Sequence, residues 1–485
     1  MPPSPTVRTV IIGAGAGGLA MARELRRSGD DDFCIFERSD AIGGVWRDNT
    51  YPGAACDVPS HLYSFSWDTP RWRQRYATQP EILANLNALC NREGLEPFLR
   101  LGTGVERLSY SEALQRWHLE LTTGETATAQ VVISAVGQLR EPFLPRICGS
   151  ELFEGESWHS SSWPTRKISL EGRDIAVIGT GASAIQLVPE IAREAHSVTV
   201  FQRTAPYVLP KAPPWSQPQQ LLFDHLSFTS KVDRLLLFLR GEVLTAGYLR
   251  SHSLSKRIAL TCRTYLEQAI PSPELRAKCT PNYEVGCKRI LFSSNWYPTL
   301  LRPNVTLVAN EAVRLDADGV FDADGQHHPA TVVIYATGFQ GQSFLQPMEV
   351  IGQNGQTLRE AWSPYPKAYF GLAVAGFPNF FMIYGPNTNL GANSVLYMEE
   401  TQVRYIATAI RYLHASHFSS LNLRRDRERS FERWIARRSK FTSYTSGCRS
   451  WYVDTQGRNI NNWPSFTWNY RRKLGQFQSS DYELR

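Results

Sequence analysis

Two stretches of the chain repeat one pattern of hydrophobic and polar positions. Residues 9–37 begin with the β-branched run TVII, pass through a glycine turn into a helical stretch, and end in the short apolar run FCIFE. Residues 174–203 repeat this order, from DIAVI through GTGAS to VTVFQR. A strand, a glycine turn, a helix and a second strand make a βαβ unit. Two such units about 165 residues apart predict an α/β protein with two Rossmann-like dinucleotide-binding domains.

The same pattern predicts how the two domains share the chain. Further elements are expected near 81–92 (helix) and 99–110, 117–122 and 131–135 (strands). The run 331–339 is predicted as a buried strand, and because its ATG at 336–338 resembles the flavoprotein signature at which the chain returns to the first domain, that domain is expected to consist of residues 1–145 and 331–485. Residues 146–330 would form a linker and the second domain, inserted into the first, with a helical insertion at about 212–280.

Length and composition are those of a large globular protein. The 485 residues are 42% hydrophobic and 20% charged, enough for about three domains, which the motif order reduces to two intertwined ones. A net charge of +7 is too small to indicate a nucleic-acid partner, and the aromatic and arginine-rich tail after Trp463 lacks an RNA-binding pattern. Nothing in the sequence predicts the oligomeric state.

No segment has the pattern of a signal peptide or a membrane span. The nearest apolar run, Leu235 to Leu249, is interrupted by Arg240 and Glu242. We therefore expect a cytoplasmic chain without stable membrane insertion. A peripheral membrane contact through the apolar residues 231–250 stays open.

The eight cysteines form no CxxC pair, and the two nearest in sequence are Cys279 and Cys287. This spacing argues against a zinc site or a redox dithiol, and we predict no metal site. In a cytoplasmic protein these thiols are expected to be reduced.

The first glycine loop fits GxGxxG directly after a strand. Gly13 allows the tight turn, Gly15 lets the backbone approach a pyrophosphate, and Gly18 lets the helix pack on the strand. The helix that begins near Ala16 directs N–H groups and a partial positive charge toward the phosphates. Glu37 ends the second strand, where a carboxylate accepts hydrogen bonds from ribose hydroxyls. The loop therefore predicts a dinucleotide site.

The second glycine loop differs at the end of its second strand. Gln202 replaces the acid, and Arg203 and Thr204 follow. A carboxylate there would repel a 2′-phosphate, whereas arginine pairs with it, so we predict NADP(H) rather than NADH. The residues expected to hold NADP in this domain are Gly179, Thr180, Gly181, Ser183, Ala184, Gln186, Arg203 and Thr204.

Three further motifs carry a resemblance to known flavoproteins. The pair Gly43-Gly44 shortly after Glu37, and ATG at 336–338, resemble the FAD signatures of flavoproteins with two dinucleotide domains. Residues 153–164, FEGESWHSSSWP, match FxGxxxHxxxWP, and residues 43–57 match [A/G]GxWxxxx[F/Y]P[G/M]xxxD. By these motifs the chain resembles the type I Baeyer–Villiger monooxygenases, which are related to flavin-containing monooxygenases, over nearly its whole length.

The resemblance implies FAD at the first site, NADPH at the second and O₂ as co-substrate. NADPH would reduce FAD, O₂ would give a C4a-peroxyflavin, and a ketone would become an ester or lactone. Besides Gly13, Gly15, Ala16, Gly18 and Glu37, the residues implied to contact FAD are Gly44, Val45, Trp46, Asp57, Tyr63 and Val105. His159 of the linker would couple domain motion to cofactor handling rather than transfer a proton.

The segment CKRIL at 287–291 resembles the active-site segment of the same family. Lys288 would contact the 2′-phosphate, and Arg289, also placed at the NADP site, would be the catalytic arginine, fixed by Asp57 as a second catalytic residue. Arginine suits this role because it keeps its charge in a dry pocket, where lysine loses it. Trp451 would lie near the nicotinamide, and residues 385–394 near the flavin and substrate.

Other functions remain as alternatives. A flavin-containing monooxygenase would oxidise nitrogen or sulfur of a small molecule with the same cofactors. A flavin disulfide reductase needs a CxxxxC pair after Glu37, where the chain offers only Cys56. A non-enzymatic flavoprotein would keep the motifs without turnover. No pattern identifies the ketone.

Overall fold

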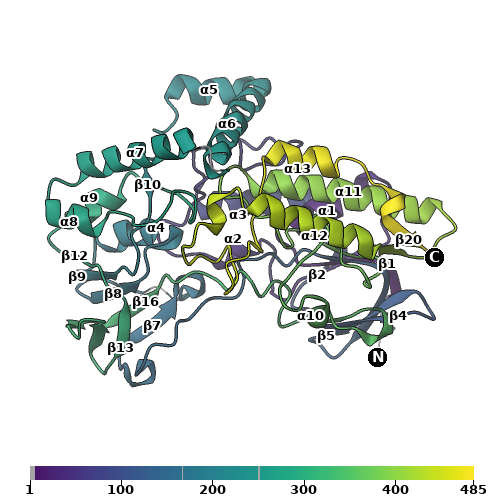
Figure 1. Cartoon of the computed structure of the whole chain (residues 1–485), viewed down its shortest axis with the longest axis horizontal. Coiled ribbons are helices and arrows are strands. Elements are labelled where there is room, and N and C mark those ends of the chain that lie inside the picture. Colours follow the sequence, from purple (N-terminus) through teal and green to yellow (C-terminus); the bar gives the residue numbers. More distant parts are fainter. Residues whose placement is uncertain (1–5, 167, 250–251) are drawn as a thin grey trace.

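The computed structural model describes residues 6–166, 168–249 and 252–485. Figure 1 shows two α/β lobes side by side, with a pair of helices projecting above the space between them. The N- and C-terminal parts of the chain share one lobe, and the middle of the chain forms the other. The prediction of a mixed α/β fold with one domain threaded through the other is confirmed.

The first lobe contains an eight-stranded sheet. Its order is β17-β4-β5-β6-β1-β2-β3, with β18 also paired to β6. Its strands are β1 (Thr6–Ile12), β2 (Phe33–Phe36), β3 (Leu99–Arg100), β4 (Val105–Ser111), β5 (Arg116–Leu121), β6 (Thr126–Ser134), β17 (Glu349–Ile351) and β18 (Phe380–Met382). The strand β1 is fully buried from Thr9 onward and pairs in parallel with β2 and β6, as a Rossmann unit requires.

Helices from both ends of the chain pack on this sheet. The helix α1 (Ala16–Arg27) packs against α11 (Val395–Ala415), and Leu19 and Ile406 lie in their common core. The other helices of this lobe are α2 (Val45–Asp48), α3 (Gln79–Arg92), α10 (Leu358–Ala361), α12 (Arg425–Ser439) and α13 (Thr467–Leu474), and a short ladder joins β19 (Leu421–Leu423) to β20 (Tyr482–Leu484). The buried Trp463 packs against Trp434 and edge-on against the buried Tyr470, so these tail residues belong to the core, whereas Trp468 is exposed.

The second lobe contains a parallel five-stranded sheet in the order β12-β9-β8-β16-β7. Its strands are β7 (Glu156–His159), β8 (Asp174–Ile178), β9 (Ser197–Phe201), β12 (Val305–Val308) and β16 (Val332–Tyr335). The helix α4 (Ala182–Ile191) crosses between β8 and β9. Smaller strands complete the lobe: β10 (Val208–Leu209), β11 (Leu291–Phe292), β13 (Ala312–Leu315), β14 (Gly319–Asp322) and β15 (His327–Pro329).

The predicted start of the second part of the first domain, at residue 331, is wrong because it assigns the strand β16 to that domain. The sequence placed residues 331–339 at the return to the first domain, but β16 pairs with β7 and β8 of the second sheet. The chain rejoins the first sheet only at β17 and β18. The error arises because a buried apolar run predicts a strand without indicating which sheet it joins. The second part of the first domain therefore begins after Tyr335, not at residue 331.

Helices fill the segment predicted as an insertion. They are α5 (Gln217–His225), α6 (Ser227–Tyr248), α7 (His252–Ala269) and α8 (Pro273–Lys278), followed by the short α9 (Trp296–Leu300). The helices α5 and α6 form the projecting pair seen in Figure 1. Within the described residues, none of the helices has the length and apolar character needed to cross a bilayer.

The expectation that all thiols are reduced is wrong for one pair. Cys287 and Cys448 form a disulfide, whereas Cys34, Cys56, Cys90, Cys148, Cys262 and Cys279 are free. The two paired cysteines are 161 residues apart in the sequence, so their spacing could not indicate that the fold brings them together.

Candidate functional site

A cleft of about 1000 Å³ lies where the two lobes meet. Eight segments that are far apart in the sequence line it, at 45–63, 139–147, 178–206, 283–291, 311–312, 336–343, 384–395 and 449–452. The predicted residues that line it are Val45, Trp46, Asp57, Tyr63, Gly179, Thr180, Gly181, Ser183, Gln186, Arg203, Thr204, Lys288, Arg289 and Trp451. The fold therefore brings most of the predicted site together.

The remaining predicted residues lie outside this cleft. They are Gly13, Gly15, Ala16, Gly18, Glu37, Gly44, Val105, His159 and Ala184. Gly13 to Glu37 form the first βαβ unit, and Gly44 contacts it because a Cβ on Gly44 would lie 3.3 Å from the Gly15 Cα. Val105 begins β4, just after Thr103, whose N–H donates to the Glu37 carbonyl.

The first glycine loop has the geometry that a dinucleotide needs. Gly13 has φ +103°, and a Cβ added to Gly18 would lie 1.9 Å from the Gly13 carbonyl oxygen, so both positions require glycine. A Cβ on Gly15 would instead meet only the Gly44 Cα, at 3.9 Å. The loop is thus closed where the helix packs on the strand and open where a pyrophosphate would approach. These residues fit an FAD pyrophosphate.

Glu37 occupies the position expected for a ribose-binding acid. Its carboxylate accepts hydrogen bonds from the N–H groups of Ala14 (2.9 Å) and Ser39 (3.0 Å), and Arg47 lies 3.3 Å away. Two backbone donors and one guanidinium fix the carboxylate at the end of β2. A ribose hydroxyl can still donate to it, because a carboxylate has about four acceptor sites.

The second glycine loop has the same turn geometry as the first, but an uncharged glutamine and an arginine follow its second strand, where the first has the carboxylate of Glu37. Gly179 has φ +112°, and a Cβ there would lie 2.5 Å from the Ala336 carbonyl oxygen, while a Cβ on Gly181 would meet nothing within 4 Å. The Gln202 side chain is buried and donates to the Lys278 carbonyl (2.7 Å), so it turns away from the loop. Arg203 is exposed and lines the cleft together with Lys288. This chemistry fits a 2′-phosphate.

The two cations of this phosphate position influence each other. Burial lowers the pKa of Lys288, and the charge of Arg203 lowers that pKa further. The Lys288 ammonium also lies 5.0 Å from the ring centroid of Tyr283. Two neighbouring positive charges attract a doubly charged phosphate.

Arg289 and Asp57 form an ion pair in the cleft, with one hydrogen bond between them. Arg289 Nη2 donates to Asp57 Oδ1 (2.9 Å), and its Nε lies 2.9 Å from Oδ2. Its Nη1 reaches the Leu390 carbonyl at 3.5 Å. Burial is the largest single influence and lowers the pKa of Arg289, but the Asp57 carboxylate together with Tyr452, Tyr248 and Cys56 outweighs it, and the pKa is raised overall. The guanidinium therefore keeps its charge, and Asp57 fixes its orientation.

Three side chains around this pair were not predicted from the sequence. Tyr248 and Tyr452 are fully buried next to Arg289, and burial raises the pKa of both phenols. Burial lowers the pKa of Lys211, while the charge of Asp57 opposes that shift. Tyr452 follows Trp451 in the segment SWY at 450–452, which the family resemblance covers, but Tyr248 and Lys211 lie in no recognised motif.

Gln186 joins the two lobes. Its Oε1 accepts from the Tyr51 hydroxyl (2.9 Å), and its Nε2 donates to the Ala55 carbonyl (2.9 Å). Gly53 lies between these contacts with φ +80°, and a Cβ there would be 2.6 Å from the Gln186 carbonyl oxygen. Residues 50–53 of the first lobe, which belong to the motif 43–57, thus pack against α4 of the second lobe.

His159 lies at the end of β7, on the path between the lobes. The Ser161 N–H donates to its Nδ1 (3.1 Å), and its ring packs edge-on against Phe339 at 5.6 Å. Burial lowers the pKa of His159, so the ring is neutral near pH 7. Phe339 belongs to the segment that leaves β16, which links the ring to the chain's return toward the first lobe.

Trp451 covers one side of the cleft. A Cβ on Gly341 would lie 2.5 Å from the Trp451 ring, so the ring packs directly on that glycine. The Asn461 amide donates to the Trp451 carbonyl, and Gln342 donates to the Val453 carbonyl (2.6 Å). The C-terminal segment is thereby attached to the segment after β16.

The fold and the site define a class. A family model described as pyridine nucleotide-disulphide oxidoreductase matches residues 10–215. With a glycine loop after a strand in each of the two sheets, the first mixed and the second parallel, the chain is an oxidoreductase with two Rossmann-type dinucleotide-binding domains.

Comparisons over the whole chain define the family. A Baeyer–Villiger monooxygenase of Pseudomonas aeruginosa is 38% identical, covering 98% of this chain and 91% of its own length. One of Streptomyces coelicolor is 39% identical, with 99% and 92% covered. The crystal structure of cyclohexanone monooxygenase from Rhodococcus sp. Phi1 bound to NADP⁺ superposes with a TM-score of 0.89 at 28% identity, covering 99% of each chain. The chain belongs to the Baeyer–Villiger monooxygenase family, as its motifs predicted.

Proposed function

We propose that this protein uses NADPH, FAD and O₂ to insert one oxygen atom beside a ketone carbonyl, giving an ester or lactone. The observation that carries this proposal is the Arg289–Asp57 pair in the cleft between the two glycine loops. The matched family and the NADP⁺-bound cyclohexanone monooxygenase with the same fold support it.

Residues of the first lobe would hold the pyrophosphate, the ribose and the ring of FAD. Gly15 and Glu37 would hold the pyrophosphate and ribose of FAD, and Trp46, Tyr63 and residues 384–390 surround the space for its ring. Trp46 donates to the Tyr63 hydroxyl (2.8 Å), which fixes both rings. When bound, FAD would supply the activated oxygen, and NADPH the electrons.

Arg289 would act on the charge that develops during oxygen transfer. The carbonyl oxygen of the ketone becomes negative as its carbon is attacked, and a guanidinium within reach stabilises that charge. Arg289 is suited to this because Asp57 leaves its Nη1 directed toward the Leu390 carbonyl, on the cleft side of the pair. Asp57 would act as a positioning residue, since it contacts Arg289 and holds its orientation.

The test separates flavin reduction from oxygen transfer. Purified protein should be yellow and should convert a ketone to an ester with NADPH. The Arg289→Ala variant should retain FAD and still be reduced by NADPH, while ester formation falls at least about a hundredfold. Arg302→Ala, at an exposed arginine outside the cleft, should behave as the parent. Full ester formation by Arg289→Ala would contradict the proposal.

A further inference from the structure

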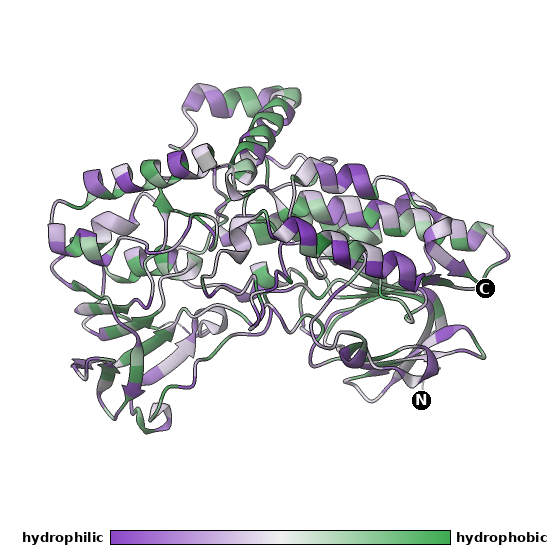
Figure 2. Cartoon of the chain, viewed as in Figure 1, coloured by the Kyte–Doolittle hydropathy of each residue, from purple (hydrophilic) through white to green (hydrophobic). Residues whose placement is uncertain are grey.

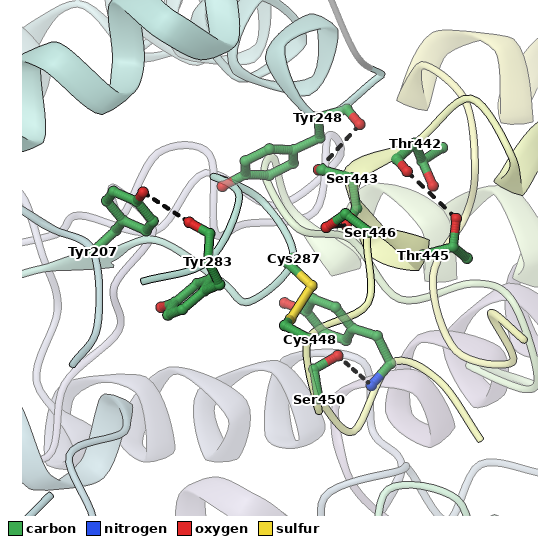
Figure 3. The surroundings of a disulfide bond; sticks show 11 residues. Tyr207, Tyr248, Tyr283, Cys287, Thr442, Ser443, Thr445, Ser446, Cys448 and Ser450 are labelled. Atoms are coloured by element: carbon green, nitrogen blue, oxygen red, sulfur yellow. Dashed lines mark hydrogen bonds between the residues drawn. A yellow bond between two sulfur atoms is a disulfide. The ribbon is translucent and has the colours of Figure 1, made fainter. Parts of the chain in front are cut away.

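Figure 3 shows the disulfide Cys287–Cys448 and its surroundings. Its Cys448 lines a second pocket, which shares Arg203, Lys288 and Arg449 with the cleft. This pocket of about 470 Å³ contains three cations from three distant segments, Arg203, Lys288 and Arg449. One exposed carboxylate, Glu284, lines it as well. Arg449 directly follows the bonded Cys448, so the disulfide determines where this third cation lies.

The disulfide joins a tightly packed segment to a loosely held one. Cys287 is fully buried, and the preceding Gly286 has φ +89°, where a Cβ would lie 2.3 Å from Ser443 Oγ. On the other side, the described part of the chain gives Gly447, Cys448 and Arg449 no hydrogen bond or ion pair. The bonds nearest to them in sequence are at Ser446 and Ser450. Within the described residues, the disulfide is thus the only cross-link, hydrogen bond or ion pair on residues 447–449.

We propose that this disulfide is a redox-controlled part of the NADPH site, which holds Arg449 as a third cation for the 2′-phosphate. The inference rests on the proposed function, because it takes Arg203 and Lys288 as the phosphate position. A dithiol reductant would open the bond by thiol–disulfide exchange. It gives two electrons and two protons to form the Cys287 and Cys448 thiols, and itself becomes a disulfide. Residues 447–449 then lose their tie, and Arg449 leaves the phosphate.

The experiment compares the affinities for NADP⁺ and NAD⁺ by titrating the purified FAD-loaded protein. A third cation at the phosphate adds a charge-assisted contact, so reduction with dithiothreitol should weaken NADP⁺ binding about tenfold and leave NAD⁺ binding unchanged. Cys448→Ser should bind like the reduced protein whether or not dithiothreitol is present. Arg449→Gln should show the same tenfold loss with the disulfide intact.

A matched control and a thiol count complete the test. Cys148 is an exposed free cysteine outside both pockets, so Cys148→Ser should bind NADP⁺ as the parent does and still respond to dithiothreitol. Thiol titration in denaturant should find six thiols, which are the eight cysteines less the bonded two, and eight after reduction. Eight thiols before reduction, or equal loss of NADP⁺ and NAD⁺ binding, would overturn the inference. Failure of the proposed function would give a different result. No ketone would yield an ester, while dithiothreitol would still weaken NADP⁺ binding.

A separate observation concerns the projecting helices α5 and α6. Six large apolar side chains recur along one face of α6, each between 50% and 61% exposed: Phe228, Val232, Leu235, Leu236, Leu239 and Val243. Leu221, Leu222 and Leu226 on and after α5 extend this apolar face. Figure 2 shows the corresponding hydrophobic colour over the projecting pair. An exposed apolar face of this kind is typical of a surface that binds a protein or a membrane.

Side chains of α6 outside this stripe attach the helix to the body of the protein. Phe238 packs against Tyr397 of α11 at 4.8 Å, and Asp233 pairs with His61 at 2.7 Å. Glu242 accepts from the Asn393 amide (2.7 Å), and Asn393 lines the cleft. The exposed apolar face is therefore presented by a helix that also contacts a residue of the active-site cleft.

The charges beside the apolar face indicate its partner. On a helical wheel, the exposed Lys231 and Arg240 flank the stripe on its two sides. The described residues 217–248 contain no exposed acid, since Glu242 is buried and Asp224 and Asp233 are half-buried. An apolar face flanked by cations is typical of a helix lying in the surface of an anionic bilayer. We infer that the apolar face of α5 and α6, together with Lys231 and Arg240, docks on anionic phospholipid membranes.

The test uses sedimentation with vesicles. The whole protein should bind phosphatidylcholine vesicles that contain phosphatidylglycerol, and bind vesicles of phosphatidylcholine alone at least about tenfold more weakly, because each cation near an anionic surface adds about 1 kcal/mol. Leu235→Gln with Leu239→Gln should abolish binding, and Leu114→Gln, at a 73% exposed leucine far in sequence, should not. Equal binding to both vesicles would overturn the inference. So would a dimer in sedimentation without lipid that the double substitution dissociates, since the face would then bind a second copy.

Discussion

Lys288 and Arg289 are neighbours in the sequence, but their side chains lie in different charged surroundings. Lys288 lies with Arg203 in the pocket beside the disulfide, whereas Arg289 contacts Asp57 in the main cleft. We propose that this short segment presents one cation to the nucleotide phosphate and the other to the reacting oxygen. The disulfide at Cys287 attaches the start of this segment to the C-terminal part of the chain.

Removing the charge of Lys288 tests its assignment to the phosphate. The Lys288→Met variant should raise the KM for NADPH about ten- to a hundredfold, because a charge-assisted contact of about 1.5–3 kcal/mol is lost, and change the KM for NADH little. Lys278→Met, which removes an exposed ion pair on α8, should match the parent. Steady-state kinetics with both nucleotides measures this. An equal rise for NADPH and NADH would contradict the assignment.

Glu399 is a buried acid whose titration should be visible in the stability of the protein. It lies on α11 facing α1, 3.5 Å from where a Cβ on Gly17 would be, and burial raises its pKa to about 8. An acid with a raised pKa in the folded state stabilises below its unfolded pKa, and that stability is lost as the pH rises through about 8.

The Glu399→Gln variant removes this titration and keeps the shape of the side chain. It should be more stable than the parent at pH 8, by at most about 4 kcal/mol, and gain nothing at pH 4. Urea unfolding at the two pH values measures the difference. Glu125→Gln, at an exposed acid, should show no such pH dependence. A stability gain that is the same at both pH values would contradict a titrating Glu399.

Among the elements, the contact of α4 with the loop 51–55 determines how the lobes meet. Gln186 bridges Tyr51 and Ala55, and Gly53 fits against the Gln186 carbonyl with a positive φ. The sequence indicated Gln186 as a nucleotide residue and Gly53 as part of a family motif. The structure gives both a second role, since they form a contact between the two dinucleotide-binding domains.

Gly53→Ala should disturb the lobe contact without removing the FAD site. The added Cβ lies 2.6 Å from a backbone oxygen at a φ that disfavours alanine, so the loop or α4 must move. We expect the KM for NADPH to rise several-fold and FAD content to stay the same. Gly172→Ala, also at positive φ but with nothing within 4 Å, controls for backbone strain alone. Loss of FAD with an unchanged KM would contradict this account.

The elements also show where sequence reasoning succeeds and where it ends. Both βαβ units were predicted because their glycine turns and apolar runs are local features, and Arg289 and Asp57 because long motifs contain them. The sheet that β16 joins, the Cys287–Cys448 bond and the position of Arg449 depend on segments more than a hundred residues apart. No local pattern carries that information. The sequence also predicted a helical insertion without indicating which face of α6 is exposed, because that depends on how the helix packs against the rest of the protein.

At the scale of the whole molecule, the cleft exists only because the chain returns to its first lobe. Residues 45–63 and 384–395 come from the first lobe, 178–206 and 283–291 from the second, and 449–452 from the tail. We propose that the two first-lobe segments contact the flavin, that 178–206 contacts the nucleotide, that 283–291 supplies the Arg289 charge and that 449–452 supplies the Trp451 cover. The activity should therefore depend on how the lobes are placed as well as on the residues that line the cleft.

The most direct test of this account is product analysis with isotopically labelled O₂. Purified protein with NADPH and a panel of linear, cyclic, aromatic and steroidal ketones should give an ester or lactone that carries one labelled oxygen atom, with one NADPH consumed per product. Mass spectrometry measures both the label and the yield. NADPH consumption that yields only hydrogen peroxide with every ketone, or a nitrogen or sulfur compound oxidised far faster than any ketone, would contradict the proposed function.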